Sequence, residues 1–208
     1  MTNPWLSVPL ADYEGHMASS EVQQLGALAD LFAEALAYCR PASVAVLGVA
    51  GGNGLDRIDS TVTRRVVGID FNPSYVEAVR QRFGALQGLE VHCLNLANQA
   101  IKLPRVQLVH AALVFEHAGL GRCLENAVTL VEPGGALSVV LQLPSEIASD
   151  VTPSAFASIQ NLKSHFSLVE TAVLREMLEE RAFLLQYETR RSLQGGKAFW
   201  MGIFVTFE

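Results

Sequence analysis

The chain has 208 residues, of which 50% are hydrophobic and 17% are charged. That length suits one α/β domain with a substantial core, and that composition argues against a disordered chain. The formal net charge of -6 would repel a phosphate backbone, so we expect no nucleic-acid partner.

The cysteines Cys39, Cys93 and Cys123 are scattered and form no CxxC pair, as is typical of a reducing compartment. Residues 1–9 have neither the basic start nor the apolar segment of a signal peptide. No apolar run approaches the roughly 20 residues that a membrane helix needs. We therefore expect a cytoplasmic protein with no membrane partner.

The first predicted element is an amphipathic helix over Ser19–Tyr38, in which apolar residues recur at helical spacing. Ser20 and Gln23 are spaced as a capping box, and Pro41 ends the helix. The residues before this helix are expected to form an N-terminal arm.

Strands and helices then alternate through the middle of the chain. Apolar strands are predicted over Ser43–Leu47, Arg65–Ile69, Leu89–Cys93, Val106–His110 and Ala136–Leu143, with helices over 72–83 and 120–131. Two more helices, over Ser154–Lys163 and Thr171–Arg181, precede an antiparallel pair of strands over Leu184–Arg191 and Lys197–Phe207. This order predicts an α/β fold with a doubly wound, mostly parallel seven-stranded sheet.

A glycine-rich loop, Gly48–Gly54, follows the first strand. Its glycines let the backbone approach a ligand closely, and the free N–H groups of a helix start favour an anionic group. Asp70 closes the second strand, where a carboxylate can accept both hydroxyls of a ribose. The loop and Asp70 together predict an adenosine-type ligand. The nicotinamide fingerprint fails, because Arg57 stands where its third glycine belongs.

From Ser43 to Phe207, these features resemble the class I S-adenosylmethionine-dependent methyltransferases. Val46–Gly54 resembles their first motif, and Asp70 matches the acidic residue that holds the ribose. The other matching segments are Asn95 after the third strand, Val109–His117, the turn Glu132–Gly135 and the closing pair of strands. The N-terminal segment Asp12–Met17 is similar to an uncharacterised bacterial branch of the family.

The resemblance implies S-adenosylmethionine as the cofactor, bound by a domain over residues 43–208. Residues 1–42 are then an N-terminal arm and helix that could close over the site as a lid. The cofactor-binding residues that it implies are Gly48, Val49, Ala50, Gly52, Asn53, Gly54, Asp70, Phe71, Asn95, Leu96 and Ala111. The chain departs from the family pattern at Gly48, Ala50 and Asn95, where the family usually has an acidic residue, a glycine and an aspartate.

A sulfonium methyl group is already activated, so such an enzyme mainly aligns the reactants and excludes water. His117 is the candidate general base, because an imidazole titrates near neutral pH. The candidate acceptor-binding residues are Phe115 and Glu116 beside it and Tyr13 and His16 in the arm.

We expect a small-molecule acceptor, because the chain lacks the Asn-Pro-Pro-Tyr and Pro-Cys motifs of base-modifying enzymes. We expect no metal, because no histidine has metal-ligand spacing with a cysteine or a carboxylate. Two alternatives stay open. One is a non-catalytic protein that binds the same cofactor, and the other is a different nucleotide enzyme, such as an aminopropyl transferase or a dehydrogenase.

Overall fold

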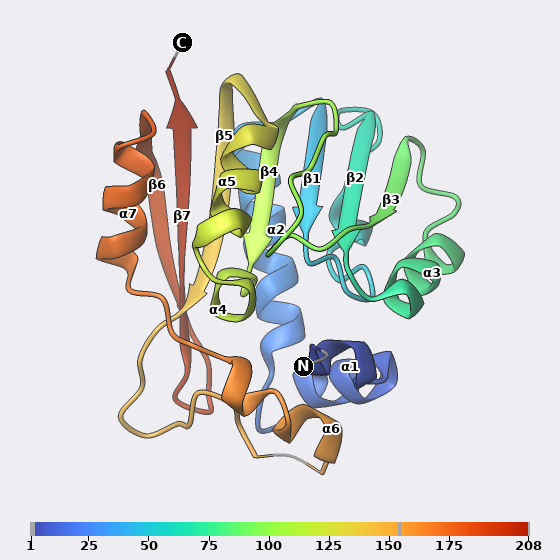
Figure 1. The fold of residues 1–208 in the computed structure, drawn as a ribbon, viewed down its shortest axis with the longest axis vertical. Helices are drawn as coiled ribbons and strands as arrows, with labels where there is room; N and C mark the ends of the chain where they lie inside the picture. The colour runs from blue at the N-terminus through green and yellow to red at the C-terminus, as the bar shows by residue number, and fades with distance from the viewer. Residues whose placement is uncertain (1–2, 154, 208) are drawn as a thin grey trace.

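A seven-stranded sheet forms the centre of the molecule (Figure 1). The structure is a computed structural model that describes residues 3–153 and 155–207. The strand order is β3-β2-β1-β4-β5-β7-β6, which confirms the predicted doubly wound sheet. The strands are β1 (Ser43–Leu47), β2 (Arg65–Asp70), β3 (Leu89–Cys93), β4 (Val106–Ala112), β5 (Val131–Gln142), β6 (Phe183–Ser192) and β7 (Ala198–Thr206).

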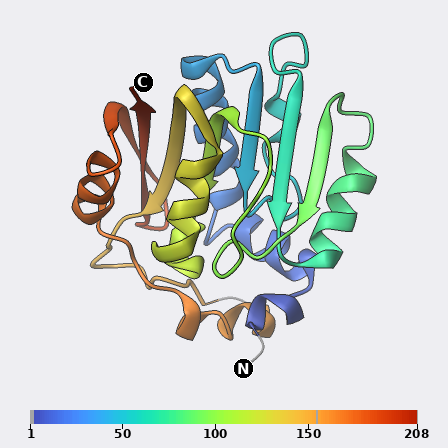
Figure 2. The same cartoon turned by 45° about the horizontal axis from the view of Figure 1, so that its top comes forward.

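Helices cover both faces of this sheet (Figure 2). Successive strand residues point to opposite faces, so Val44 and Val46 pack into one core while Ala45 and Leu47 pack into the other. The helices are α1 (Leu10–Ala18), α2 (Gln24–Cys39), α3 (Pro73–Arg82), α4 (Phe115–Ala118), α5 (Gly121–Leu130), α6 (Ala157–Gln160) and α7 (Thr171–Glu179). Within the described residues, every helix is too short or too polar to cross a lipid bilayer.

The two cores divide the helices between the faces of the sheet. Side chains of α2 and α3 join the core of Val44, and side chains of α5 and α7 join the core of Leu47. Strands β1 to β5 are all parallel, so their carboxyl ends share one edge of the sheet. The strand order reverses between β1 and β4, and ligands of such sheets bind outside the strand ends at this point.

The last two strands are antiparallel, as predicted. β7 pairs with β6 on one side and with β5 on the other, both antiparallel. The beginning of β7 therefore lies beside the carboxyl end of β5, where Phe199 is opposite Gln142. Lys197, which immediately precedes β7, is thereby brought to the ligand-binding edge of the sheet.

The N-terminal region differs from its prediction. The helix expected from Ser19 begins only at Gln24, and Gln23 has a left-handed φ of 51° with no side-chain cap, so the predicted capping box is wrong. Ser19 instead starts a turn, in which the Ser19 carbonyl accepts hydrogen bonds from Val22 N and Gln23 N. The turn buries Val22 in the core, and it lets the arm form a helix of its own, α1, that the sequence analysis missed.

Two other segments depart from the prediction. The turn expected at Glu132–Gly135 is an irregular part of the longer strand β5, where the register of the pairing with β4 shifts. The helix expected over Ser154–Lys163 is reduced to α6 and a short 3-10 turn at Lys163–His165, and Ser154 itself lies outside the described residues.

Candidate ligand-binding site

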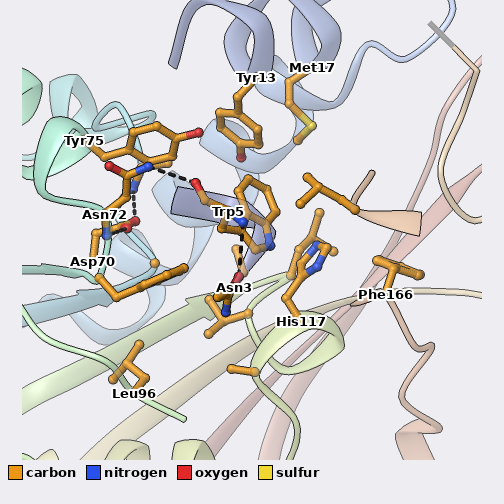
Figure 3. Close-up of a pocket in the computed structure, with 18 of the residues that line it drawn as sticks. Asn3, Trp5, Tyr13, Met17, Asp70, Asn72, Tyr75, Leu96, His117 and Phe166 are labelled. Atoms are coloured by element: carbon orange, nitrogen blue, oxygen red, sulfur yellow. Dashed lines mark hydrogen bonds between the residues drawn. The ribbon is translucent and has the colours of Figure 1, made fainter. Parts of the chain in front are cut away.

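A cavity of about 170 Å³ lies at the carboxyl edge of the sheet, beneath α1 and the residues that precede it (Figure 3). Its walls come from the ends of β1 to β5, from the N-terminal region and from the segment around α6. Among the residues predicted from the sequence, those that line it are Tyr13, His16, Gly48, Ala50, Asp70, Phe71, Asn95, Leu96 and His117. The cavity therefore brings together predicted cofactor-binding residues, predicted acceptor-binding residues and the predicted general base.

Asp70 is the acidic residue of this cavity that ends β2. It is 7% exposed, and its Oδ2 accepts a hydrogen bond from Ala50 N at 3.0 Å while its Oδ1 accepts one from Asn72 N at 2.9 Å. Burial raises the pKa of Asp70, and the backbone N–H groups of Asn72, Ala50 and Phe71 oppose that shift. A carboxylate offers about four lone-pair positions, so the bonds from Ala50 N and Asn72 N leave room for further donors.

The glycine-rich loop is only partly exposed to the cavity. Gly48 and Ala50 line it, whereas Val49 is buried in the core beneath the loop. Both cavity-lining residues have left-handed φ values, 65° for Gly48 and 46° for Ala50. The loop thus keeps the glycine-like backbone of the family motif, although an alanine occupies one of its places.

The second half of the loop lies away from the cavity. A Cβ at Gly54 would lie 3.0 Å from the Phe32 ring, and Asn53 Nδ2 donates to Leu25 O at 2.9 Å. A Cβ at Gly52 would lie 2.4 Å from Phe83. These residues therefore fix the loop against α2 and against the end of α3, and they do not line the cavity.

The backbone of Ala50 provides a first test of this loop. Replacement of Ala50 by glycine is expected to raise the free energy of unfolding by up to about 1 kcal/mol, because glycine removes the steric cost of a left-handed φ. Replacement of Gly48 by alanine is expected to lower it by at least about 1 kcal/mol, because it adds that cost. The new Cβ would also lie 2.8 Å from Val114 Cγ2. Urea unfolding of both variants measures the two effects, and effects of the same sign would contradict the loop geometry.

The end of β3 forms another wall of the cavity. Asn95 Oδ1 accepts a bond from Ala97 N at 3.0 Å, and the carbonyl of Leu96 accepts one from the buried Asn126 Nδ2 at 2.8 Å. Asn126 thereby holds this wall in place from α5. Ala111 belongs to the core, and its neighbour Ala112 lines the cavity instead.

The N-terminal residues cover the cavity with aromatic rings. The Trp5 ring makes edge contacts with Tyr13 and His117, with centroid distances of 5.6 and 4.9 Å (Figure 3). The carbonyl of Trp5 accepts a bond from Asn72 Nδ2 at 2.9 Å, and the carbonyl of Val8 accepts one from a buried tyrosine hydroxyl on α3 at 3.0 Å. The cover is therefore attached at two points to the segment that follows Asp70.

His117 lies on α4, between the rings of Trp5 and Phe166. Burial lowers its pKa to about 4, so the imidazole is neutral at pH 7. Its neighbours Phe115 and Glu116 do not line the cavity: Phe115 is in the core, and Glu116 is buried with its Oε1 accepting a bond from Gln142 N. Of the four predicted acceptor-binding residues, Phe115 and Glu116 are therefore outside the cavity that contains His117, whereas Tyr13 and His16 line it.

Three polar residues that no sequence pattern indicated also line the cavity. They are Gln24 at the start of α2, Gln142 at the end of β5, and Lys197 before β7. Sequence patterns gave no reason to group them, because Gln24 and Gln142 are 118 positions apart and only the antiparallel pairing of β7 brings Lys197 beside Gln142. Among residues 3–153 and 155–207, no group of three or more His, Cys, Asp or Glu residues could hold a metal ion.

Comparison with known proteins gives one family match. Residues 46–137 match the family model described as a methyltransferase domain, which spans the loop, Asp70 and the first part of β5. No curated protein matches the chain.

Several solved structures share the fold at low sequence identity. The N-methyltransferase NodS from Bradyrhizobium japonicum WM9, in complex with S-adenosyl-l-homocysteine, is 15% identical with a TM-score of 0.69, and the match covers 100% of both chains. Magnesium protoporphyrin IX methyltransferase (ChlM) from Synechocystis PCC 6803, with bound SAM, is 12% identical with a TM-score of 0.61, over 88% of this chain and 78% of that one. The [4+2]-cyclase SpnF is 12% identical with a TM-score of 0.68, over 89% and 82%. At these identities the likeness shows the fold alone.

Proposed function

We propose that this chain, whose fold and family match are those of a class I S-adenosylmethionine-dependent methyltransferase, transfers a methyl group to a small-molecule acceptor. The observation that carries the proposal is the position of Asp70. Its buried carboxylate lines the cavity beside Gly48 and Ala50, at the edge of the sheet where ligands of this fold bind.

The residues of this wall fit the cofactor. The Asp70 carboxylate has lone pairs left for the two ribose hydroxyls, and Leu96 and Phe71 offer apolar surface for the adenine. Gly48 and Ala50 leave the loop backbone open to the methionine part of the ligand. When bound, S-adenosylmethionine supplies a sulfonium-activated methyl group for attack by a nucleophile.

The remaining walls suit a small and partly apolar acceptor. Trp5, Tyr13 and Phe166 close the cavity with aromatic rings, together with aliphatic side chains from the segment around α6. Such walls exclude water and restrict the orientation of a bound molecule, which is the main contribution that methyl transfer requires from the protein. The net charge of -6 repels a phosphate backbone, which disfavours a nucleic acid as the acceptor.

His117 is proposed to contact the acceptor. With a pKa of about 4, it enters the reaction as a neutral imidazole, and it can therefore accept a hydrogen bond or a proton from the acceptor. A base of such low pKa is weak, so its function is foremost to position the acceptor and only secondarily to take a proton. Phe115 and Glu116 are not assigned to the acceptor, because they lie outside the cavity.

Calorimetry with three ligands tests the proposed cofactor. Titration with S-adenosylmethionine is expected to give heat, whereas decarboxylated S-adenosylmethionine and NAD are expected to bind at least about tenfold more weakly. Preference for the decarboxylated compound would favour an aminopropyl transferase, and preference for NAD would favour a dehydrogenase. The absence of heat with all three would contradict the ligand assignment.

A non-catalytic protein of the same fold is the second candidate. The departures at Gly48, Ala50 and Asn95 favour it, because they alter the places that hold the cofactor in the family that this chain resembles. The similarity of the fold to a [4+2]-cyclase also shows that this architecture serves other reactions. Formation of S-adenosylhomocysteine with any member of a panel of metabolites would decide for the methyltransferase. Tight binding of the cofactor without turnover would keep the second candidate open.

We further propose that the N-terminal arm is a lid over a methyltransferase domain that begins near residue 43. Replacement of Trp5 by alanine is expected to weaken the binding of S-adenosylhomocysteine about fivefold, because the variant loses the ring contacts with Tyr13 and His117 that close the cavity. Stopped-flow release of the ligand would show a faster rate. Replacement of the exposed Leu6 by alanine is the control and should change neither value. Tighter binding by the Trp5 variant would contradict a lid, because the ring would then be an obstruction.

A further inference from the structure

We propose that the methyl acceptor carries a carboxylate, and that Lys197 binds this carboxylate with the help of Gln24 and His16. The inference rests on the proposed function and specifies the substrate class of that same cavity. Its evidence is the chemistry of the polar end of the cavity. This end lies at β5 and β7 in the strand order, away from Asp70 at the end of β2.

Lys197 is a buried cation that forms no ion pair with any of the described residues. The residue is 5% exposed, and its Nζ donates only to neutral oxygens: Gln142 Oε1 at 3.2 Å and the carbonyl of Asp150 at 2.7 Å. Among the described residues, no carboxylate lies within ion-pair distance of this ammonium group. A buried charge costs free energy unless it is paired. An anionic ligand at this position would provide the ion-pair partner that Lys197 lacks.

Two other polar side chains that line the cavity also lack partners among the described residues. His16 and Gln24 are 5% and 4% exposed, and within residues 3–153 and 155–207 nothing forms a hydrogen bond with His16 Nδ1 or Gln24 Nε2. Buried polar atoms without partners are rare in folded proteins and each one needs a reason. Both residues line the cavity with Lys197, and a carboxylate with two oxygens would satisfy such donors together.

The charges around Lys197 agree with an anion site. Asp150 is the acidic residue whose charge acts on Lys197, and it contributes its carbonyl and not its carboxylate to the contact. Burial lowers the pKa of His16, and the charge of Lys197 adds to that shift. Burial lowers the pKa of Lys197 to about 8, so the ammonium form still dominates at neutral pH. Lys197 is therefore the positive group at this end of the cavity, and its ammonium can pair with the carboxylate of an acceptor although the charge of Asp150 also acts on it.

The rest of the cavity indicates what the carboxylate is attached to. Val151, Ile159, Leu162 and Phe166 line the cavity near α6 and present apolar surface. The anion site is at β5 and β7, whereas Asp70 is at β2, so an acceptor bound by its carboxylate would extend toward the cofactor across the end of β4. The structure therefore favours an organic acid with an apolar body, held at one end by its charge.

Matched pairs of carboxylates and their neutral amides test the inference. The probes are phenylacetate with phenylacetamide, indole-3-acetate with indole-3-acetamide, and hexanoate with hexanamide, each titrated by calorimetry into the protein saturated with S-adenosylhomocysteine. In at least one pair the carboxylate is expected to bind about tenfold more tightly than the amide. The Lys197→Met variant is expected to lose this preference, and the Lys102→Met variant, at an exposed lysine outside the cavity, is expected to keep it.

Further controls keep the result interpretable. Gln24→Leu removes a side chain that has no partner at its Nε2, so this variant should fold and should reduce the preference even if Lys197→Met does not fold. No preference in any pair, or a preference that survives both substitutions, would overturn the inference. Titration of the same samples with S-adenosylhomocysteine reports the cofactor wall separately. A carboxylate preference without cofactor binding would therefore reject the proposed function and leave the anion site standing.

Discussion

Replacement of Asp70 by asparagine is expected to weaken the binding of S-adenosylhomocysteine about 10- to 100-fold. The variant keeps the shape of the side chain but loses the negative charge that would accept both ribose hydroxyls, and one amide NH₂ replaces an accepting oxygen. Loss of charge-assisted hydrogen bonds in a buried site costs about 1.5–3 kcal/mol, which corresponds to this change in the dissociation constant. Isothermal titration calorimetry measures it directly.

The control for this prediction is a nearby acidic residue outside the cavity. Asp56 is exposed in the short 3-10 helix Leu55–Arg57, so Asp56→Asn removes the same charge without touching the cavity. Its affinity should remain within about twofold of the unmodified protein. An Asp70→Asn variant with unchanged affinity would remove Asp70 from the binding site, and the proposed cofactor would then lose its main support.

Replacement of Glu116 by glutamine is expected to change how the stability of the protein depends on pH. Glu116 is 2% exposed, and burial raises its pKa from 4.5 to about 7. The folded state therefore holds the proton more tightly than the unfolded state does. The stability from this group is fully present below about pH 4.5 and is lost as the pH rises through about 7. A shift of that size corresponds to about 3 kcal/mol.

Glutamine does not titrate, so the variant lacks this loss. The free energy of unfolding of Glu116→Gln, minus that of the unmodified protein, should rise by about 3 kcal/mol between pH 4.5 and 8 in urea unfolding experiments. Burial lowers the pKa values of His110 and His117, so these two groups make the protein more stable as the pH rises. Both proteins contain these histidines, so their effects cancel in the difference. Glu125→Gln, at an exposed position on α5, is the control. A difference that does not vary with pH would show that Glu116 ionises normally.

Much of the fold follows from local sequence signals. Each predicted parallel strand is a short apolar run between polar or glycine residues, and such runs suit strands that are buried on both faces. Asn72 and Pro73 begin α3 as the sequence indicates, with the Asn72 side chain accepting a bond from Ser74 N. Asp70 could be selected because its place at the end of a strand is defined by the sequence itself.

The N-terminal region could not be predicted in the same way. Its conformation depends on contacts with distant residues, such as the bond from Asn72 Nδ2 to the carbonyl of Trp5, and not on a periodic pattern. Val22 fits the spacing of the predicted helix, but it is buried in a turn whose left-handed Gln23 separates α1 from α2. Helix boundaries set by tertiary packing in this manner are not encoded in local propensities.

The acceptor side of the cavity shows the same limit. Phe115 and Glu116 follow β4 and were reasonable candidates, but the short helix α4 turns both into the interior and presents His117 instead. Lys197 and Gln24 reach the cavity from positions that only the assembled sheet and the α1–α2 turn define. Residues that a fold brings together from distant elements carry no common signal in a single sequence.

A crystal structure of the protein with S-adenosylhomocysteine tests the proposed site most directly. We expect both ribose hydroxyls within about 3 Å of the Asp70 carboxylate and the adenine against Leu96. The sulfur atom should face the space between His117 and Lys197. Adenosine bound elsewhere in the molecule, or a ribose that does not contact Asp70, would contradict the proposal.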